Sequence, residues 1–371
     1  MEIVNEMRKL AKGFDSPTIA VVGSHSALDV CAGARKYGIK NLVICQKGRE
    51  RPYDLHYKRK GNVGCVDETL ILSKFAELCN DANVKLLQKK QAILVPHRSL
   101  CVYVGYDALE KCPVPIFGNR FLLKAEERNV PNNQRDLLVK AGLNVPKLYV
   151  ADEIDGLAIV KASEAKRSYE RAFFFVSSPE EYEKKSREMI ARGIITRQGL
   201  ETAIIEEYVV GVPFNFNFFY SPLAHRLELV GIDIRRQTNL DGVLRLPADE
   251  QLEVLKRIRV RNIEAGHVAC TIRESILETV FDMGEKFIET CRKEYPPGIP
   301  GPFALQSLLA NSEDGEKMYI YDVSFRMPGS PGIKCTPYGN YLYGESLNMG
   351  ERVAMEVKEA LKQNALDKLV T

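Results

Sequence analysis

The sequence predicts two consecutive units, an α/β unit followed by a mixed α+β unit, and three observations support this. Short apolar runs alternate with helix-like segments in the first third of the chain. Strand-like runs that can form antiparallel hairpins dominate the remainder. The chain has 371 residues, which is too long for one ordinary core.

The first unit, residues 1–120, has apolar runs at 18–23, 40–46, 91–97 and 113–118 that read as strands. Segments 27–38 and 68–83 have helical spacing of apolar residues. Strands that alternate with helices form a parallel sheet covered on both faces, and ligands bind at the carboxyl ends of such strands. "GSHS" (23–26) and "PHRS" (96–99) lie at two of these ends.

The second unit, residues 121–371, divides near 215 into two expected subdomains, 121–215 and 216–371. A helix is expected to begin at Ser178 and to end at Gly193. A helix over 273–295 precedes two strands, 302–311 and 317–327, and a last helix begins near residue 348.

Charge and composition exclude several classes of function. The 52 basic and 49 acidic residues leave a net charge of +3 and give no general attraction to nucleic acid or to a membrane. The apolar runs are too short to span a bilayer, and the first residues lack the apolar segment of a secretory signal, so we expect a cytoplasmic protein. The nine cysteines have no zinc-ligand spacing and are expected to act as small buried hydrophobic residues.

The last predicted hairpin carries the clearest chemical pattern. Gln306 and Asp322 lie on its two strands, and alternation places Asp322, Ser324 and Arg326 on one face. Oxygen ligands on neighbouring strands can hold Mg²⁺ or Mn²⁺, and Arg326 could then neutralise the charge of a transferring phosphoryl group. The alternative interpretation is a surface hairpin with a solvated polar face.

A second pattern is consistent with nucleotide binding. Lys161 ends an apolar strand and is a candidate phosphate ligand, although strands often end in lysine. "IIEEYVVG" (204–211) could pair with an adenine edge or could be an ordinary buried strand. The segment after Lys161 contains no glycine where a phosphate-binding loop would use them. Arg167 and Arg171 could replace the glycines or could be surface charges.

The order of these pieces resembles the ATP-grasp superfamily of carboxylate-activating ligases. More closely, the chain resembles the archaeal formate-dependent 5-formaminoimidazole-4-carboxamide ribonucleotide synthetases of purine biosynthesis. The resembling stretches span nearly the whole chain in family order, and they include "GSHSALDV", "VPHRS", "VPIFGNRFLLKAEE", "AIIEEYVVGVPFNFNFFYSPL", "LVGIDIRRQTNLDGVLRLPA", "RESILETVFDMGEKF", "PPGIPGPFALQSL" and "GESLNMGERVA".

The resemblance implies an ATP-grasp fold with an N-terminal parallel α/β domain and a two-step ligation. ATP phosphorylates formate, and the 5-amino group of aminoimidazole carboxamide ribonucleotide attacks the formyl phosphate. The residues that the resemblance assigns are His25, Ser99 and His267 for the nucleotide substrate, Lys124, Lys161, Glu206, Val209 and Gln237 for ATP, and Gln306 and Asp322 for the metal.

This chain departs from the family at these sites. Gln237 and Asp322 stand where the family has glutamates, and His267 stands where it has an asparagine. The family usually has a glycine-rich loop after the lysine strand. A divergent member that binds a purine-pathway nucleotide without catalysis, or with another substrate, is therefore the alternative function.

A nicotinamide dehydrogenase is disfavoured because "GSHSALDV" lacks the three-glycine dinucleotide fingerprint. The small-molecule partners expected are a nucleotide and formate, and a homo-oligomer is expected because enzymes of this type often form one.

Overall fold

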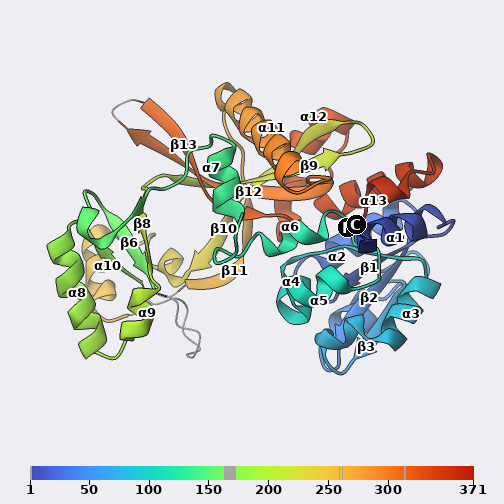
Figure 1. Ribbon diagram of the computed structural model, residues 1–371, viewed down its shortest axis with the longest axis horizontal. Helices are drawn as coiled ribbons and strands as arrows, with labels where there is room; N and C mark the ends of the chain where they lie inside the picture. The colour runs from blue at the N-terminus through green and yellow to red at the C-terminus, as the bar shows by residue number, and fades with distance from the viewer. Residues whose placement is uncertain (1, 163–172, 259, 261, 313–314) are drawn as a thin grey trace.

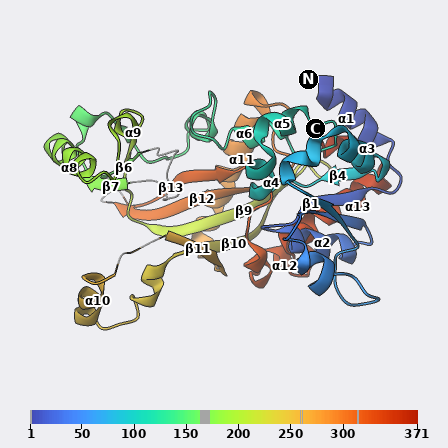
Figure 2. The ribbon, with the colours of Figure 1, turned by 90° about the horizontal axis from the view of Figure 1, so that it is seen from below.

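The computed structural model describes residues 2–162, 173–258, 260, 262–312 and 315–371. Three sheets follow one another along the long axis of the molecule (Figure 2). A parallel four-stranded sheet lies at one end, an antiparallel five-stranded sheet lies in the middle, and an antiparallel four-stranded sheet lies at the other end.

The parallel sheet has the order β3-β2-β1-β4. Its strands are β1 (Thr18–Val22), β2 (Lys40–Gln46), β3 (Glu68–Leu72) and β4 (Ala92–Leu94). Ile19 and Val21 point to one face, and Ala20 and Val22 point to the other, so both faces of β1 are apolar. The first face packs against α1 (Glu2–Lys12), α2 (Ala27–Lys36) and α13 (Met349–Lys362). The second packs against α3 (Asp81–Lys89), α4 (Arg98–Val104) and α5 (Tyr106–Lys111).

The end of the chain returns to the N-terminal unit, and the two termini lie close together (Figure 1). Helix α13 packs on α2, where Gly33 meets Gly350, and Phe117 forms a β-bridge with Val370. The C-terminal helix therefore belongs to the same hydrophobic core as the parallel sheet. The proposed boundary at residues 120–121 remains a prediction.

The central sheet has the order β11-β10-β9-β12-β13. Its strands are β9 (Val212–Ser221), β10 (Arg226–Thr238), β11 (Asn262–Ala269), β12 (Gly301–Ser312) and β13 (Gly315–Ser324). In "FNFNF" on β9, Phe214, Phe216 and Phe218 enter the core, whereas Asn215 and Asn217 point to the opposite, polar face. Helices α7 (Gln134–Lys140) and α11 (Leu277–Glu294) cover the apolar face.

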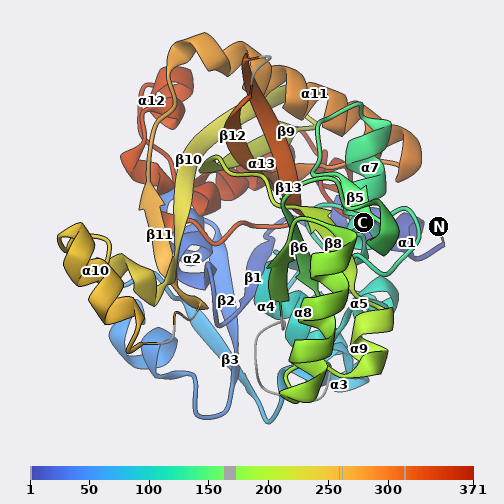
Figure 3. The same cartoon turned by 90° about the vertical axis from the view of Figure 1, so that its left-hand side faces the viewer.

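The third sheet has the order β5-β8-β6-β7 and a small core of its own. Its strands are β5 (Leu148–Tyr149), β6 (Ala158–Lys161), β7 (Phe173–Val176) and β8 (Ile204–Glu207). Helices α8 (Pro179–Ala191) and α9 (Arg197–Glu201) lie beside it, while α10 (Ala248–Leu255) stands away from the body of the molecule (Figure 3). The remaining short helices are α6 (Arg120–Lys124) and α12 (Tyr338–Tyr343).

Most predicted elements are present, and two are wrong. The helix expected over 68–83 is instead β3, a 3₁₀ turn (Phe75–Cys79) and the start of α3, because Glu68–Leu72 pairs in parallel with Leu42–Gln46. The strand expected over 113–118 forms only isolated bridges at Ile116 and Phe117. The nine cysteines are free, and Cys335 alone is exposed. In the part of the chain that the structure describes, no helix is long and apolar enough to cross a membrane.

Candidate active site

The carboxyl ends of β1 and β4 bring "GSHS" and "PHRS" together, as expected for adjacent parallel strands. His97 caps α4 by accepting a hydrogen bond at Nδ1 from the Ser99 amide at 3.2 Å. Its Nε2 then donates to the Val22 carbonyl at 2.9 Å, which fixes the neutral tautomer. Burial lowers the pKa of His97 to about 4. The Ser99 hydroxyl donates to Ser24 Oγ at 3.0 Å, so the two loops are joined.

His25 stacks on His97 with ring centroids 5.3 Å apart. Ser26 donates its hydroxyl proton to the Pro328 carbonyl at 2.8 Å, so His25 Nδ1 is the donor in its 2.7 Å contact with Ser26 Oγ. His25 keeps an exposed surface, but protein atoms around its imidazole partly remove the ring from water. That desolvation, with His97, Arg326, His267 and Arg235 as further causes, lowers the pKa of His25.

The segment after β13 closes this site from the other side. The Met327 amide donates to the Pro96 carbonyl at 3.0 Å, next to His97. Arg326 Nε lies 3.1 Å from Oε1 of Glu126, a carboxylate that is buried and that also accepts a hydrogen bond from the Phe325 amide at 2.9 Å. Burial raises the pKa of Glu126, and the positive charge of Arg326 partly offsets this effect. Arg326 is thus fixed by a buried partner beside His25 and His97.

A row of polar side chains crosses the open face of the central sheet. Asp233, Asn215, Gln306 and Asp322 occupy neighbouring register positions on β10, β9, β12 and β13. Asn215 Nδ2 donates to Asp233 Oδ2 at 3.0 Å, and Gln306 Nε2 donates to Asp322 Oδ2 at 2.8 Å. The expected metal pair therefore lies together on adjacent strands.

The donor set at this pair fits a magnesium ion that shares its ligands with a substrate. Among the described residues, no three His, Cys, Asp or Glu side chains gather as a metal site. Gln306 and Asp322 supply oxygen ligands, and Mg²⁺ commonly takes one or two protein carboxylates with phosphates and water. Arg235 Nη2 donates to Gln306 Oε1 at 3.1 Å, so this contact must open before that oxygen binds a cation.

His267 on β11 faces Arg235 in the strand register and contacts buried Asp233 through Nδ1. Asp233 also accepts a 2.6 Å hydrogen bond from Asn217 Nδ2 at its other oxygen. Ser330 Oγ lies 3.4 Å from His267 Nδ1. His267 is one of the groups that lower the pKa of His25, after burial, His97 and Arg326. The two histidines therefore belong to one cluster.

The residues assigned to ATP are only partly brought together. Lys161 at the end of β6 pairs with Glu206 on β8, and Arg128 and Arg135 also approach this buried carboxylate, at 3.4 and 3.9 Å. Lys124 instead pairs with Asp107 on α5 at 2.7 Å, near the surface.

The remaining ATP assignments lie on or beside strands. Val209 is half-buried in the connection after β8, and Gln237 is exposed near the end of β10. Arg167 and Arg171 lie outside the residues that the structure describes. The ATP roles of these residues remain predictions.

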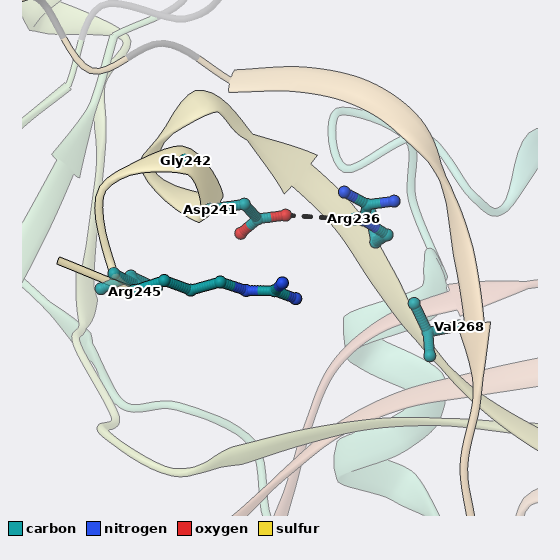
Figure 4. Close-up of a pocket in the computed structure, with 6 residues that line it drawn as sticks. Arg236, Asp241, Gly242, Arg245 and Val268 are labelled. Carbon is teal, nitrogen blue, oxygen red and sulfur yellow. Dashed lines mark ion pairs between the residues drawn. The ribbon is translucent and has the colours of Figure 1, made fainter.

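A cavity of about 620 Å³ lies on the opposite face of the β10–β11 pair (Figure 4). Strand alternation places Arg236 and Val268 on that face, whereas Arg235 and His267 point toward the polar row. Arg236 is 3.6 Å from Asp241, which belongs to the same wall of the cavity. The cavity is therefore separate from the cluster around His25.

Several residues of the site could not be assigned from the sequence. They lie in or next to motifs that the sequence analysis used, but without a role of their own. "PHRS" contains His97, "KAEERN" contains Glu126 and Arg128, and "GIDIRR" contains Asp233 and Arg235. The only signal for Asp233 was the alternation of polar and apolar residues on its strand. Its partner His267 is 34 residues further along the chain.

Comparison with known proteins supports one family. A family model described as a protein of unknown function, DUF1246, matches residues 19–149, and a second, described as a domain of unknown function, DUF1297, matches residues 181–371. A 5-formaminoimidazole-4-carboxamide-1-(beta)-D-ribofuranosyl 5'-monophosphate synthetase from Methanopyrus kandleri is 37% identical over 358 residues, which are 95% of each chain.

Two solved structures are similar in fold. The crystal structure of an IMP biosynthesis protein, PurP, from Thermococcus kodakaraensis matches with a TM-score of 0.69 and 26% identity, over 95% of this chain and 100% of that one. An ADP complex of an N5-carboxyaminoimidazole ribonucleotide synthetase matches with a TM-score of 0.53 and 13% identity, over 90% and 78%. The ATP-grasp fold expected from the resemblance is confirmed. The chain belongs to the family of 5-formaminoimidazole-4-carboxamide-1-(beta)-D-ribofuranosyl 5'-monophosphate synthetases.

Proposed function

We propose that this protein is an ATP-dependent ligase of IMP biosynthesis that formylates 5-aminoimidazole-4-carboxamide ribonucleotide with formate, giving ADP and phosphate. The observation that carries the proposal is the convergence of His25, Ser99 and His267, three residues from separate segments that the family resemblance assigns to the nucleotide substrate, with Arg326, which strand alternation placed beside the expected metal pair. The similarity to relatives with this activity extends over nearly the whole chain.

In the proposed reaction, a formate oxygen attacks the γ-phosphorus of ATP, and ADP leaves. The 5-amino nitrogen then attacks the formyl carbon, and inorganic phosphate leaves. His25, which donates to Ser26 Oγ, and Ser99 would orient the ribonucleotide. Arg326 would place positive charge where the phosphoryl group moves. Glu126 holds the guanidinium in place, so little reorganisation is needed at that step.

Gln306 and Asp322 would hold Mg²⁺ or Mn²⁺. When bound, the ion would neutralise phosphate charge and align phosphate oxygens. Asp322 keeps the carboxylate of the glutamate that the family has, on a side chain one methylene shorter. Arg235 would have to release Gln306 Oε1 before that oxygen binds the ion.

ATP would lie between the third sheet and the central sheet, with its phosphates near Lys161. Lys161, Arg128 and Arg135 together carry three positive charges around the single carboxylate of Glu206. The surplus positive charge favours a polyphosphate. These side chains supply attraction that a glycine-rich loop would otherwise provide through backbone amides.

ADP release tests the proposal when ATP, Mg²⁺, formate and the ribonucleotide are omitted one at a time. Release that requires all four, with the formylated ribonucleotide as product, is the expected result. Release that persists without formate would indicate a different acyl donor. Ribonucleotide binding without release under any condition would favour a non-catalytic member of the family.

We also propose that the enzyme works in the cytoplasm as a homo-oligomer. Light scattering coupled to size-exclusion chromatography would test the assembly, because a mass near 41.8 kDa would indicate a monomer.

A further inference from the structure

The imidazole of His267 contacts a buried carboxylate on its Nδ1 side. The family resemblance assigns this residue only as a contact of the nucleotide substrate. His267 Nδ1 contacts Asp233 Oδ2, and Asp233 is fully buried on β10. When Nδ1 donates its proton to Asp233, the neutral ring carries its lone pair on Nε2. Nε2 lies on the far side of the ring, so it points away from Asp233.

Hydrogen bonds from neighbouring side chains keep the Asp233 carboxylate ionised and hold its orientation. Asn215 and Asn217 donate to its two oxygens at 3.0 and 2.6 Å. Burial alone would raise the pKa of Asp233, but the hydrogen bonds from His267, Asn217 and Asn215 hold it below its ordinary value. Both asparagines are neutral donors, so of the three side chains that the structure shows bonded to Asp233, His267 is the one that can become positively charged.

The other groups around His267 come from three other segments. Arg235 lies beside it on β10, His25 comes from the loop after β1, and Arg326 and Ser330 come from the segment after β13. Cys270, directly after β11, has its pKa raised to about 11 by burial and, secondarily, by the negative charge of Asp233. Lys334, in the turn packed against β11, is engaged by Glu351 at 2.6 Å. Asp233 lies where it can balance the positive charge that the imidazole would gain by accepting a proton during the reaction.

We propose that His267 is the general base for the second step of the reaction, with Asp233 as its positioning residue. The inference rests on the proposed function. The lone pair of the 5-amino nitrogen forms the N–C bond to the formyl carbon of formyl phosphate. The amine proton passes to His267 Nε2, the bond between the formyl carbon and the phosphate oxygen breaks, and inorganic phosphate leaves. The imidazolium then releases its proton to solvent.

Because His267 acts only after formyl phosphate has formed, its loss separates the two steps. Hydroxylamine traps an acyl phosphate as a hydroxamate, which a ferric reagent detects, and this reaction needs no enzymatic base. His267→Asn introduces the residue that the family has at this position, so it tests whether this chain, unlike its relatives, depends on an imidazole there. The amide keeps a hydrogen-bonding group but cannot accept the proton. We expect hydroxamate formation with ATP, Mg²⁺ and formate within about twofold of the unaltered enzyme. Formylated ribonucleotide should form about 10²- to 10⁴-fold more slowly.

A matched control is His225→Asn, since His225 is exposed in the turn between β9 and β10 and has a left-handed φ of 51° that asparagine tolerates. It should leave both rates unchanged. Asp233→Asn should show the same split as His267→Asn, because without the carboxylate the imidazole is no longer held with its proton on Nδ1 and its lone pair on Nε2.

The outcomes separate the inference from the function on which it rests. If the unaltered enzyme gives neither hydroxamate nor formylated product, the proposed function fails. If it gives both, and His267→Asn keeps product formation within about threefold, the general-base role is overturned. An equal fall in both rates of His267→Asn also overturns it, because the residue then serves binding or folding.

Discussion

Gln306 and Asp322 lie directly opposite each other on β12 and β13, and Gln306 Nε2 donates to Asp322 Oδ2 at 2.8 Å. A β-bulge immediately after Gln306 shifts the register of the two strands from Ser307 onward. The pair therefore sits at the last regular position of the ladder on that side. It also sits at the end of the polar row that begins with Asp233.

This relationship predicts the effect of Asp322→Asn. The substitution keeps the shape and a hydrogen-bonding oxygen but removes the charge that attracts a divalent cation. We expect the Mg²⁺ concentration at half-maximal ADP release to rise at least about tenfold, and kcat to fall by about 10². Titration of Mg²⁺ against ADP release measures both.

Asp282→Asn is the control for Asp322→Asn, because Asp282 is an exposed carboxylate on α11 that pairs with Lys286 within the same helix. It should leave the Mg²⁺ dependence unchanged. An Mg²⁺ dependence of Asp322→Asn equal to that of the unaltered enzyme would rule out the metal assignment.

The pairing of Gln306 with Asp322 could be predicted from the sequence because it depends on two neighbouring strands and strict alternation. The contact of Arg235 with Gln306 could not, since it joins positions 71 residues apart on strands that are not adjacent. The Glu126–Arg326 pair spans 200 residues and depends on how the linker after α6 meets the last hairpin. Local patterns thus identify elements and motifs, whereas the partners of the site side chains depend on the tertiary arrangement.

The wrong prediction of a helix over residues 68–83 has the same cause, because tertiary contacts decide the structure of this segment. Its apolar residues at 70, 71, 75, 78 and 79 fit one helix face. Pairing with β2 nevertheless makes the first part an edge strand, since tertiary contacts outweigh the small differences in helix propensity. Phe75 and Leu78 still enter the core, but they do so from a 3₁₀ turn.

Gly329→Ala should disturb the nucleotide site through His25. A Cβ atom at position 329 would lie 2.6 Å from His25 Nε2 and 2.8 Å from Cε1, so the imidazole would have to move off His97. Since a displacement of about 1 Å can cost about 10²-fold in rate, we expect kcat/KM for the ribonucleotide to fall by about 10- to 100-fold. Steady-state kinetics with saturating ATP and formate measure this.

The comparison variant is Gly332→Ala, three residues further on, where the nearest atom to an added Cβ is 3.9 Å away. Its kcat/KM should equal that of the unaltered enzyme. If Gly329→Ala behaved in the same way, His25 would have no role in binding the ribonucleotide.

The lowered pKa of buried His97 predicts how the free energy of unfolding changes with pH. Its pKa is about 4 in the folded protein and 6.5 when unfolded, so between these values the unfolded chain binds more protons. The free energy of unfolding therefore rises as pH increases from 4 to 6.5, by up to about 3 kcal/mol from this residue. Its full contribution is present above pH 6.5 and is lost as pH falls toward 4.

His97→Asn tests this linkage, because asparagine can still cap α4 but does not titrate. Urea unfolding at pH 7.5 and pH 4.5 should show a smaller pH-dependent loss in the variant than in the unaltered protein, by about 2 to 3 kcal/mol. The exposed His225→Asn should keep the full loss. Equal pH dependence in all three proteins would contradict a neutral buried His97.

Lys161→Ala should weaken ATP binding. Lys161 ends β6 and meets Glu206, where two arginines already balance the carboxylate, so its removal lowers the positive charge available to a polyphosphate. We expect the KM for ATP to rise at least about tenfold while the KM for the ribonucleotide changes little. Lys147→Ala is the control, since Lys147 is exposed and pairs with Asp155 in the same subdomain. Equal KM values for ATP in the two variants would place the phosphates elsewhere.

Gly33→Ala should destabilise the whole N-terminal unit, because α2 and α13 cross with their backbones in contact. A Cβ at position 33 would lie 2.2 Å from the Gly350 carbonyl oxygen, and one at position 350 would lie 2.1 Å from that of Asp29. Neither helix can yield by rotating a side chain, so the helices must separate, at a cost near the upper end of the usual range for overpacking, about 3 kcal/mol.

Helix α2 starts directly after His25 and Ser26, so separation of the two helices also moves the nucleotide site. We therefore expect Gly33→Ala to lower both the unfolding midpoint and the affinity for the ribonucleotide, measured by urea unfolding and by calorimetric titration. Gly242→Ala is the matched control, because an added Cβ there meets nothing within 4 Å. A Gly33→Ala protein as stable as this control would mean that α13 does not pack on α2 in solution, and that the end of the chain does not support the site.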